Sequence, residues 1–299
     1  MVNRRCPICN SDDESDVYAE ADFDIAKLNE FAFASRKLPE YMHYRLITCS
    51  KCDLLYANPL PEMGVIADAY EDASFDSGVE AEFASRTYAD SLPRIQKRLS
   101  DMDGALDIGT GDGAFLEKLL QGGFTSVFGV EPSSAPIEAA KPEIKPLIRK
   151  GLFDSKDFDS DRFQLISCFQ TIEHLYDPFA MTKEMYKLLK TGGAVYIICH
   201  NRESFVNRAL KFKSPIFDIE HLQLFSPNSI KSLLKESGFE NVEVFPIVNK
   251  YPLSYWFKLF PLPEKIKQAL LRFLNSSKIG NLPISIPVGN MAAIGYKIS

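Results

Sequence analysis

One segment, Leu106–Leu116 (LDIGTGDGAFL), constrains the fold of this chain more than any other. It begins with an apolar strand end, continues with three glycines that alternate with short residues, and opens an amphipathic helix at Phe115. Because glycine has no Cβ, its backbone can adopt a positive φ or approach a ligand closely. The start of the helix presents free N–H groups that favour an anion. The segment therefore predicts the cofactor-binding edge of a doubly wound α/β sheet.

The spacing of these glycines distinguishes between two kinds of cofactor. Gly109, Gly111 and Gly113 form a G-x-G-x-G pattern, whereas the dinucleotide fingerprint is G-x-G-x-x-G. The next predicted strand, Ser126–Glu131, ends in a carboxylate 22 residues after Gly109. A carboxylate in this position can accept hydrogen bonds from both hydroxyls of a ribose. An NAD site is the alternative, and the glycine spacing disfavours it.

Later segments fit the remaining strands of such a sheet. Phe163–Phe169 has the pattern of a buried strand, and Leu189–Ile198 fits a helix end, a glycine turn and a fifth strand. The other matching segments are Gln170–Pro178 (QTIEHLYDP), a crossover helix within Leu222–Phe239, and a final antiparallel strand pair, Val242–Phe245 and Met291–Tyr296.

These motifs together resemble those of the class I S-adenosylmethionine-dependent methyltransferases, over residues 86–299. The resemblance implies an α/β fold with a doubly wound, Rossmann-like seven-stranded methyltransferase sheet, and S-adenosylmethionine as the cofactor. It implies that Gln170 and Thr171 line the methyl-donor end and that Phe153 stacks on the adenine. The full set of cofactor-binding residues that it implies is Asp107, Gly109, Gly111, Gly113, Glu131, Phe153, Gln170 and Thr171.

The candidate catalytic residues are the adjacent pair Glu220 and His221, together with His174. The resemblance places a Glu-His pair beyond the fifth strand, facing the acceptor, where imidazole can act as a base near neutral pH. His174 follows the fourth strand, beside the sulfonium in the expected fold. The alternative for each histidine is a structural role, in which it supports its own loop. His200 departs from the proline–asparagine common in the family, so no role is carried over to it.

Four cysteines near the N-terminus predict a metal site. Cys6 and Cys9 form one C-x-x-C pair, and Cys49 and Cys52 form another, which supplies the four sulfur ligands of a closed, structural zinc site. The long intervening stretch is expected to be helical around residues 25–33. Free or redox-active thiols are the alternative.

The predicted organisation has three parts. Residues 1–61 form a zinc-binding module, residues 62–85 form a linker and the helix leading into the core, and residues 86–299 form the methyltransferase domain, with an insertion at about 249–288. A zinc module, an N-P-x-P turn at Asn58–Pro61 and a methyltransferase core resemble a subset of bacterial methyltransferases that act on sugars or surface glycans. This resemblance implies that the acceptor is a small molecule, a sugar or glycan precursor.

Charge and hydropathy bear on the alternatives. The net charge of −6, and of −7 within the first hundred residues, argues against an RNA base methyltransferase, whose zinc module should be basic. A non-catalytic scaffold that binds the cofactor is a further alternative.

The N-terminus lacks an apolar signal region, which predicts a cytoplasmic protein without a membrane span. Aromatic residues and lysines are interleaved in residues 251–274. This composition predicts a cap that packs on the sheet edge and the acceptor cleft, or a peripheral contact with a membrane.

Overall fold

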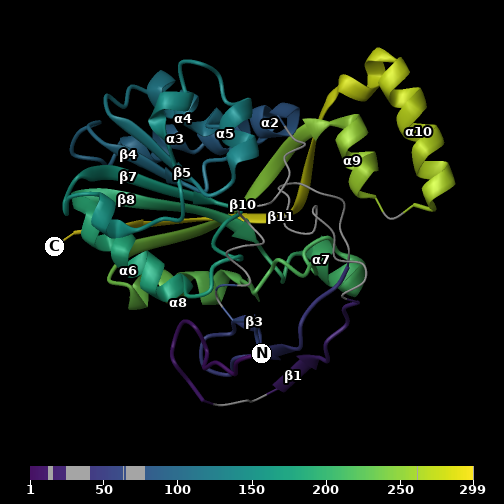
Figure 1. The fold of residues 1–299 in the computed structure, drawn as a ribbon, viewed down its shortest axis with the longest axis horizontal. Coiled ribbons are helices and arrows are strands. Elements are labelled where there is room, and N and C mark those ends of the chain that lie inside the picture. The colour runs from purple at the N-terminus through teal and green to yellow at the C-terminus, as the bar shows by residue number, and fades with distance from the viewer. Residues whose placement is uncertain (13–15, 25–40, 63, 65–77, 261, 299) are drawn as a thin grey trace.

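The computed structural model describes residues 1–298 except for 13–15, 25–40, 63, 65–77 and 261 (Figure 1). The helix expected around residues 25–33 and much of the expected linker therefore lie outside the described residues. The helix leading into the core is described from Gly78. Among the described residues, none of the helices has the length and hydropathy needed to cross a bilayer.

A seven-stranded sheet forms the centre of the molecule, in the order β10-β11-β8-β7-β4-β5-β6. Its strands are β4 (Ala105–Ile108), β5 (Val127–Glu131), β6 (Ile148–Lys150), β7 (Phe163–Phe169), β8 (Leu189–His200), β10 (Glu240–Pro252) and β11 (Pro283–Tyr296). The strands β4 to β8 pair in parallel, and β11 is antiparallel to both β8 and β10. The predicted doubly wound, seven-stranded fold is confirmed.

Helices cover both faces of this sheet (Figure 1). One layer contains α2 (Gly78–Ala89), α3 (Leu92–Gln96), α4 (Ala114–Gln121) and α5 (Ser134–Ala139), and the other contains α6 (Pro178–Leu188) and α8 (Pro227–Glu236). Because side chains alternate along a strand, each face has its own apolar core: Leu106 and Ile108 pack with α6 and α8, whereas Ala105 packs with α4. The remaining helices are α7 (Phe205–Leu210), α9 (Leu253–Leu259) and α10 (Glu264–Ser276), with single-turn helices η2 (Lys145–Leu147), η3 (Ser155–Asp157), η4 (Lys211–Lys213) and η5 (Lys278–Asn281).

A second, four-stranded sheet joins the N-terminal residues to the core. Its strands are β1 (Asp16–Ala19), β2 (Leu46–Thr48), β3 (Leu55–Ala57) and β9 (Gln223–Leu224). Three of these strands come from the predicted zinc module, whereas β9 belongs to the predicted methyltransferase domain and pairs with β3. The predicted boundaries at 61/62 and 85/86 remain a prediction, and this shared sheet packs the two parts together.

The last two strands are longer than the sequence suggested. They were expected to flank an insertion of about 249–288, but β10 runs to Pro252 and β11 starts at Pro283, and the two remain paired over this extension. The insertion is thus partly a two-stranded hairpin, with α9, α10 and η5 at its tip (Figure 1). We call residues 246–289 the C-terminal arm.

Candidate active site at the carboxyl ends of the strands

The glycine loop, Gly109–Gly113, joins β4 to α4, and all three of its glycines have a positive φ, of 73°, 59° and 74°. A Cβ on Gly109 would lie 2.4 Å from Thr171 Oγ1, and one on Gly113 would lie 2.4 Å from Ile144 Cγ2. A Cβ on Gly111 would meet no described atom within 4 Å. Two of the glycines therefore allow close packing within the protein, whereas Gly111 borders open space that a ligand can approach.

Glu131, at the end of β5, reaches this loop with its side chain. Its carboxylate accepts hydrogen bonds from the backbone N–H groups of Gly111 and Ser133, at 2.9 Å each. The side chain is buried, and burial raises the pKa of its carboxyl group. An ionised carboxylate has about four acceptor positions, and the hydrogen bonds from these N–H groups and from the Ser133 side chain leave the rest for a ligand. This arrangement suits the predicted contact with a ribose.

Asp107 lies within the sheet, beneath the glycine loop. It stands opposite Ser167 in the register of β4 and β7, and its carboxylate accepts a hydrogen bond of 2.6 Å from the Ser167 hydroxyl. Burial raises the pKa of Asp107 to about 7. This geometry fastens β4 to β7, and the predicted contact of Asp107 with the cofactor remains a prediction.

The loop after β7 contains Gln170 and Thr171. Gln170 has a φ of 49°, and neither atom of its buried side-chain amide has a hydrogen-bond partner among the described residues. A buried polar group without a partner costs about 1–3 kcal/mol, so a polar ligand at this point would recover that energy. Thr171 packs over Gly109. Phe153, three residues beyond β6, is half-buried and packs on the core, and its stacking on the adenine remains a prediction.

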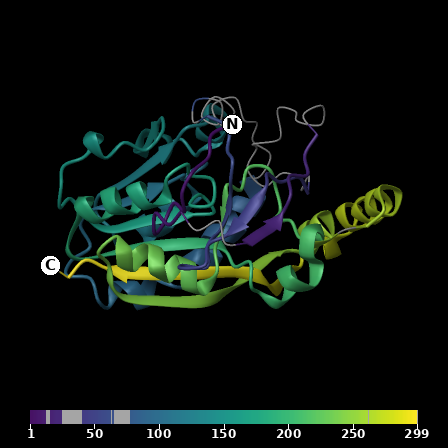
Figure 2. The same cartoon turned by 90° about the horizontal axis from the view of Figure 1, so that it is seen from below.

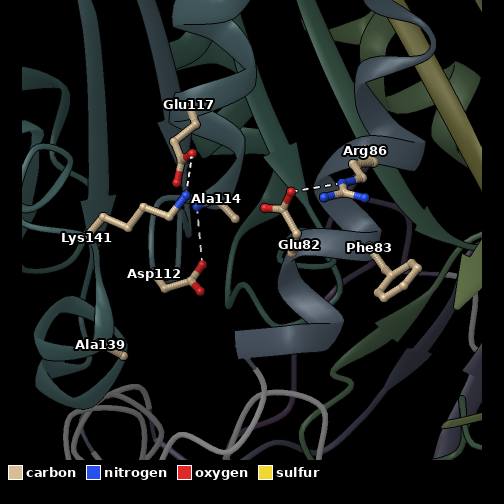
Figure 3. Close-up of a pocket in the computed structure, with 8 residues that line it drawn as sticks. All are labelled: Glu82, Phe83, Arg86, Asp112, Ala114, Glu117, Ala139 and Lys141. Carbon is tan, nitrogen blue, oxygen red and sulfur yellow. Dashed lines mark hydrogen bonds and ion pairs between the residues drawn. The ribbon is translucent and has the colours of Figure 1, made fainter. Parts of the chain in front are cut away.

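A cavity of about 550 Å³ lies beside the glycine loop (Figure 3). Its lining residues come from α2, from the glycine loop and the start of α4, and from the end of α5 and the residues just after it: Glu82, Phe83, Arg86, Asp112, Ala114, Glu117, Ala139 and Lys141. Charges of both signs line it, and they form the ion pairs Arg86–Glu82 at 2.8 Å and Lys141–Glu117 at 2.7 Å. The cavity meets the glycine loop at Asp112, on the α2 side.

Three histidines meet at the carboxyl ends of β7 and β8, and we call His174, His200 and His221 the histidine cluster. The ring centroids of His174 and His200 lie 4.9 Å and 5.1 Å from that of His221. Glu220 joins them, with a carboxylate oxygen 3.8 Å from His174 Nδ1. The structure thus brings the three predicted catalytic residues together. One ligand atom from each of His174, Glu220 and His221 lies within 4.8 Å of the others, a spacing that also suits a cation.

Hydrogen bonds to carbonyl oxygens fix the tautomer of two of these rings. His221 Nδ1 lies 2.8 Å from the carbonyl oxygen of Ile216, and His174 Nδ1 lies 3.2 Å from that of Glu220. A carbonyl oxygen only accepts hydrogen bonds, so Nδ1 carries the hydrogen in both rings. In the neutral form of this tautomer the lone pair lies on Nε2, which is the atom that a general base uses.

One member of this cluster, His200, and one neighbour, Glu173, were not predicted as site residues from the sequence. His200 Nδ1 lies 2.8 Å from Asn290 Oδ1, and burial lowers the pKa of His200 to about 4, so this ring is neutral. Glu173 is fully buried beneath the cluster, and its carboxylate accepts a 2.7 Å hydrogen bond from the backbone N–H group of His200. Burial raises the pKa of Glu173 to about 7. The position of His200 at the end of a parallel strand was the available signal.

The four N-terminal cysteines form a compact cluster. The Sγ atoms of Cys6 and Cys52 lie 3.4 Å apart, those of Cys9 and Cys49 lie 3.5 Å apart, and all four lie within 4.8 Å of one another. A disulfide needs about 2.05 Å, so these thiols are free, whereas tetrahedral zinc with bonds of about 2.3 Å needs sulfur separations near the observed ones. The donor set and its geometry fit zinc.

Arg4 connects the cysteine cluster to the histidine cluster. Its guanidinium donates to the carbonyl oxygens of Ala57 at 3.0 Å, Tyr176 at 3.1 Å and Leu222 at 2.7 Å. Leu222 follows His221 directly and leads into β9, which pairs with β3. The N-terminal residues therefore hold the loop that carries Glu220 and His221.

Comparisons with known proteins show the family of this chain. A family model described as "Methyltransferase domain" matches residues 81–244, which is more than half of the chain. The "Ubiquinone biosynthesis O-methyltransferase" of Coxiella burnetii is 25% identical over 174 residues, which cover 50% of this chain and 70% of that protein. The family match includes the glycine loop and the histidine cluster, and excludes the four cysteines and the C-terminal arm.

Solved structures with a similar arrangement include a SAM-dependent methyltransferase from Archaeoglobus fulgidus, which is 18% identical with a TM-score of 0.49. That match covers 79% of this chain and 100% of the other. A second is phosphoethanolamine N-methyltransferase 2 from Haemonchus contortus in complex with S-adenosyl-L-methionine, which is 15% identical with a TM-score of 0.49. It covers 82% of this chain and 62% of the other.

Proposed function

Because this chain belongs to the methyltransferase-domain family, as a class I S-adenosylmethionine-dependent methyltransferase, we propose that it transfers the methyl group to a hydroxyl of a small-molecule acceptor. The observation that carries this proposal is the histidine cluster, in which His174 and Glu220 lie close to His221, whose Nδ1 atom lies 2.8 Å from the Ile216 carbonyl oxygen. A hydroxyl is a weak nucleophile until its proton is removed, so its methylation benefits from a base at the acceptor. The name of the Coxiella relative, an O-methyltransferase, supports the same chemistry.

The cofactor residues are proposed on the geometry of this chain. Gly111 leaves open space, Glu131 keeps free acceptor positions for a ribose, and Gln170 offers an amide that lacks a partner among the described residues. S-adenosylmethionine, when bound, supplies a methyl carbon attached to a positively charged sulfur. The protein orients that carbon towards the acceptor and excludes water.

His221 is proposed as the base. Its Nδ1–H group is held by Ile216, so Nε2 takes the proton and the ring becomes positively charged. A carboxylate oxygen of Glu220 lies within 4.8 Å of a ring nitrogen of His221, which favours that charge. His174, the neighbouring ring, is proposed to orient the acceptor.

The finer identity of the acceptor is also a proposal. A sugar or glycan precursor is retained because the cysteine module and the methyltransferase core resemble the enzymes that act on them. The structural zinc at the cysteine cluster is proposed on the donor set and its spacing. The cytoplasmic location and the three-part domain organisation remain predictions.

The test replaces His221 with asparagine. The asparagine amide can still donate to the Ile216 carbonyl, whereas the Nε2 lone pair is lost. We expect kcat to fall by about 100- to 10,000-fold, with unchanged affinity for S-adenosylhomocysteine. His43→Asn is a matched control, because His43 is also buried and its Nδ1 also bonds a carbonyl oxygen, at 2.8 Å, outside the cluster. Unchanged turnover in His221→Asn would remove His221 as the base.

A further inference from the structure

The C-terminal arm extends beyond the support of the main sheet. The pairing of β11 with β8 ends at Asn290, opposite His200. Further along, β11 pairs only with β10, up to Pro252 opposite Pro283. The arm ends in α9, α10 and η5, and both views show α10 at one extremity of the molecule (Figures 1 and 2).

The arm has a small core of its own and a surplus of apolar side chains. Tyr251, Tyr255, Trp256 and Leu274 are buried, which holds α9 and α10 on the hairpin. Outside this core, large apolar side chains of the arm are exposed: Val248, Phe260, Ile266, Phe273, Ile279, Leu282 and Ile284. These are seven of the sixteen exposed large apolar side chains found among the described residues, although the arm is about one seventh of the chain. Such a concentration marks an interaction surface.

Helix α10 shows how this surface is built. Its buried residue Leu274 lies on one face, whereas Ile266 and Phe273, which are 56% and 59% exposed, lie two turns apart on a neighbouring face. Lys265 and Arg272 precede these two residues and have the same seven-residue spacing, so they line the far edge of the exposed apolar stripe. The apolar arc of α10 is therefore wider than the protein itself covers, and it is bordered by positive charge.

The charge of the arm is opposite to that of the whole protein. Residues 246–289 contain six Lys/Arg and one Asp/Glu, in a chain whose net charge is −6. A second copy of this acidic chain would have to present an apolar face together with acidic side chains to match the arm. An anionic bilayer surface offers both an apolar interior and negative headgroups, which is the combination that basic amphipathic helices recognise.

We propose that the C-terminal arm docks on the surface of a membrane that contains anionic lipids, with α10 in the plane of the interface and the Ile266–Phe273 stripe inserted. At 13 residues, α10 is suited to lying on a bilayer rather than crossing it. The attraction of Lys265 and Arg272 to the headgroups makes the docking dependent on salt. The surface is independent of the glycine loop, so docking requires no cofactor.

The test is co-sedimentation of the full chain with phosphatidylcholine vesicles, prepared with and without phosphatidylglycerol. We expect binding only to the anionic vesicles, and a decrease of about tenfold or more in bound fraction at high salt. Ile266→Ser with Phe273→Ser should abolish binding, and Lys265→Glu with Arg272→Glu should do the same.

Matched controls are Phe205→Ser, because Phe205 is 87% exposed on α7, and Lys145→Glu on η2. Affinity for S-adenosylhomocysteine verifies that each variant is folded. Equal binding to both kinds of vesicle, binding to neither, or full binding by the arm variants would overturn the proposal. A dimer in solution that disappears with Ile266→Ser and Phe273→Ser would overturn it in favour of a second copy of the chain.

Discussion

Replacing Glu131 with glutamine tests the cofactor site most closely. The carboxylate accepts from the N–H groups of Gly111 and Ser133 at 2.9 Å each, and its remaining acceptor capacity is proposed to bind the ribose. A glutamine amide has one oxygen, and its NH₂ group faces a donor. The variant therefore loses at least one charge-assisted hydrogen bond to the ligand, which is about 1.5–3 kcal/mol, or about 10- to 160-fold in Kd.

The assay is isothermal titration with S-adenosylhomocysteine, next to a thermal unfolding curve. Leaving one buried N–H group unpaired also lowers the free energy of unfolding by about 1–3 kcal/mol. Glu143→Gln is the control, because Glu143 is an exposed carboxylate in a nearby loop and should leave both quantities unchanged. A Kd for Glu131→Gln within about threefold of the wild type would refute the assignment of Glu131 to the ribose.

Three further predictions concern the glycine loop, a buried carboxyl group and the cysteine cluster. Gly111→Ala should lower the free energy of unfolding by about 1–2 kcal/mol, because alanine is strained at this positive φ. Gly113→Ala should lower it by about 1–3 kcal/mol more, because the added Cβ also meets Ile144. Urea unfolding measures both values, and equal losses would contradict the packing argument. Burial raises the pKa of Glu173 from 4.5 to about 7, so its contribution to the free energy of unfolding is fully present below pH 4.5 and is lost as pH rises through 7. The free energy of unfolding of Glu173→Gln should therefore exceed that of the wild type by about 3 kcal/mol at pH 8 and equal it at pH 4.5. Parallel profiles of stability against pH for the two proteins would contradict this. Purified Cys49→Ser should contain about one zinc per chain less than the wild type, as measured with a chromogenic chelator. Its melting temperature should be lower, while S-adenosylhomocysteine still binds. An unchanged melting temperature would argue against a structural metal.

The cofactor end of the fold was predictable from the sequence because the backbone itself demands particular residues there. Gly109 and Gly113 are needed where a Cβ would collide with Thr171 or Ile144, and Gly111 is needed for its φ of 59°. These requirements are local, so they appear as a short motif. The fold class followed, because that motif was joined by strand patterns of the expected order.

The surroundings of the histidine cluster were harder to predict because they depend on contacts between distant segments. Asn290 meets His200 through the pairing of β11 with β8, and no local pattern relates these two residues. Likewise β9 is only two residues long, yet its pairing with β3 brings the cysteine module against the loop of Glu220 and His221. A strand of that length leaves no periodicity to detect.

The extension of β10 into the arm was missed for a different reason. Side chains alternate between buried and exposed from Ile247 to Tyr251, as in any half-buried strand. However, Asn249 is buried, and its side-chain Oδ1 atom accepts a hydrogen bond from the Asn290 side chain, while its neighbour Val248 is exposed. A polar residue thus occupies a buried position and an apolar residue occupies an exposed one, so the sequence here lacks the alternating hydropathy that indicates a strand.

The central claim is that the glycine loop presents a methyl donor to an acceptor that His221 deprotonates. It is tested most directly by following labelled methyl from S-adenosylmethionine into fractionated cell extract, sorted into nucleotide sugars, lipid-linked material, RNA and protein. The account predicts label in the sugar or lipid-linked fraction with the wild type, attached to oxygen by nuclear magnetic resonance, and almost none with His221→Asn. Label confined to RNA, or equal labelling by wild type and His221→Asn, would contradict it.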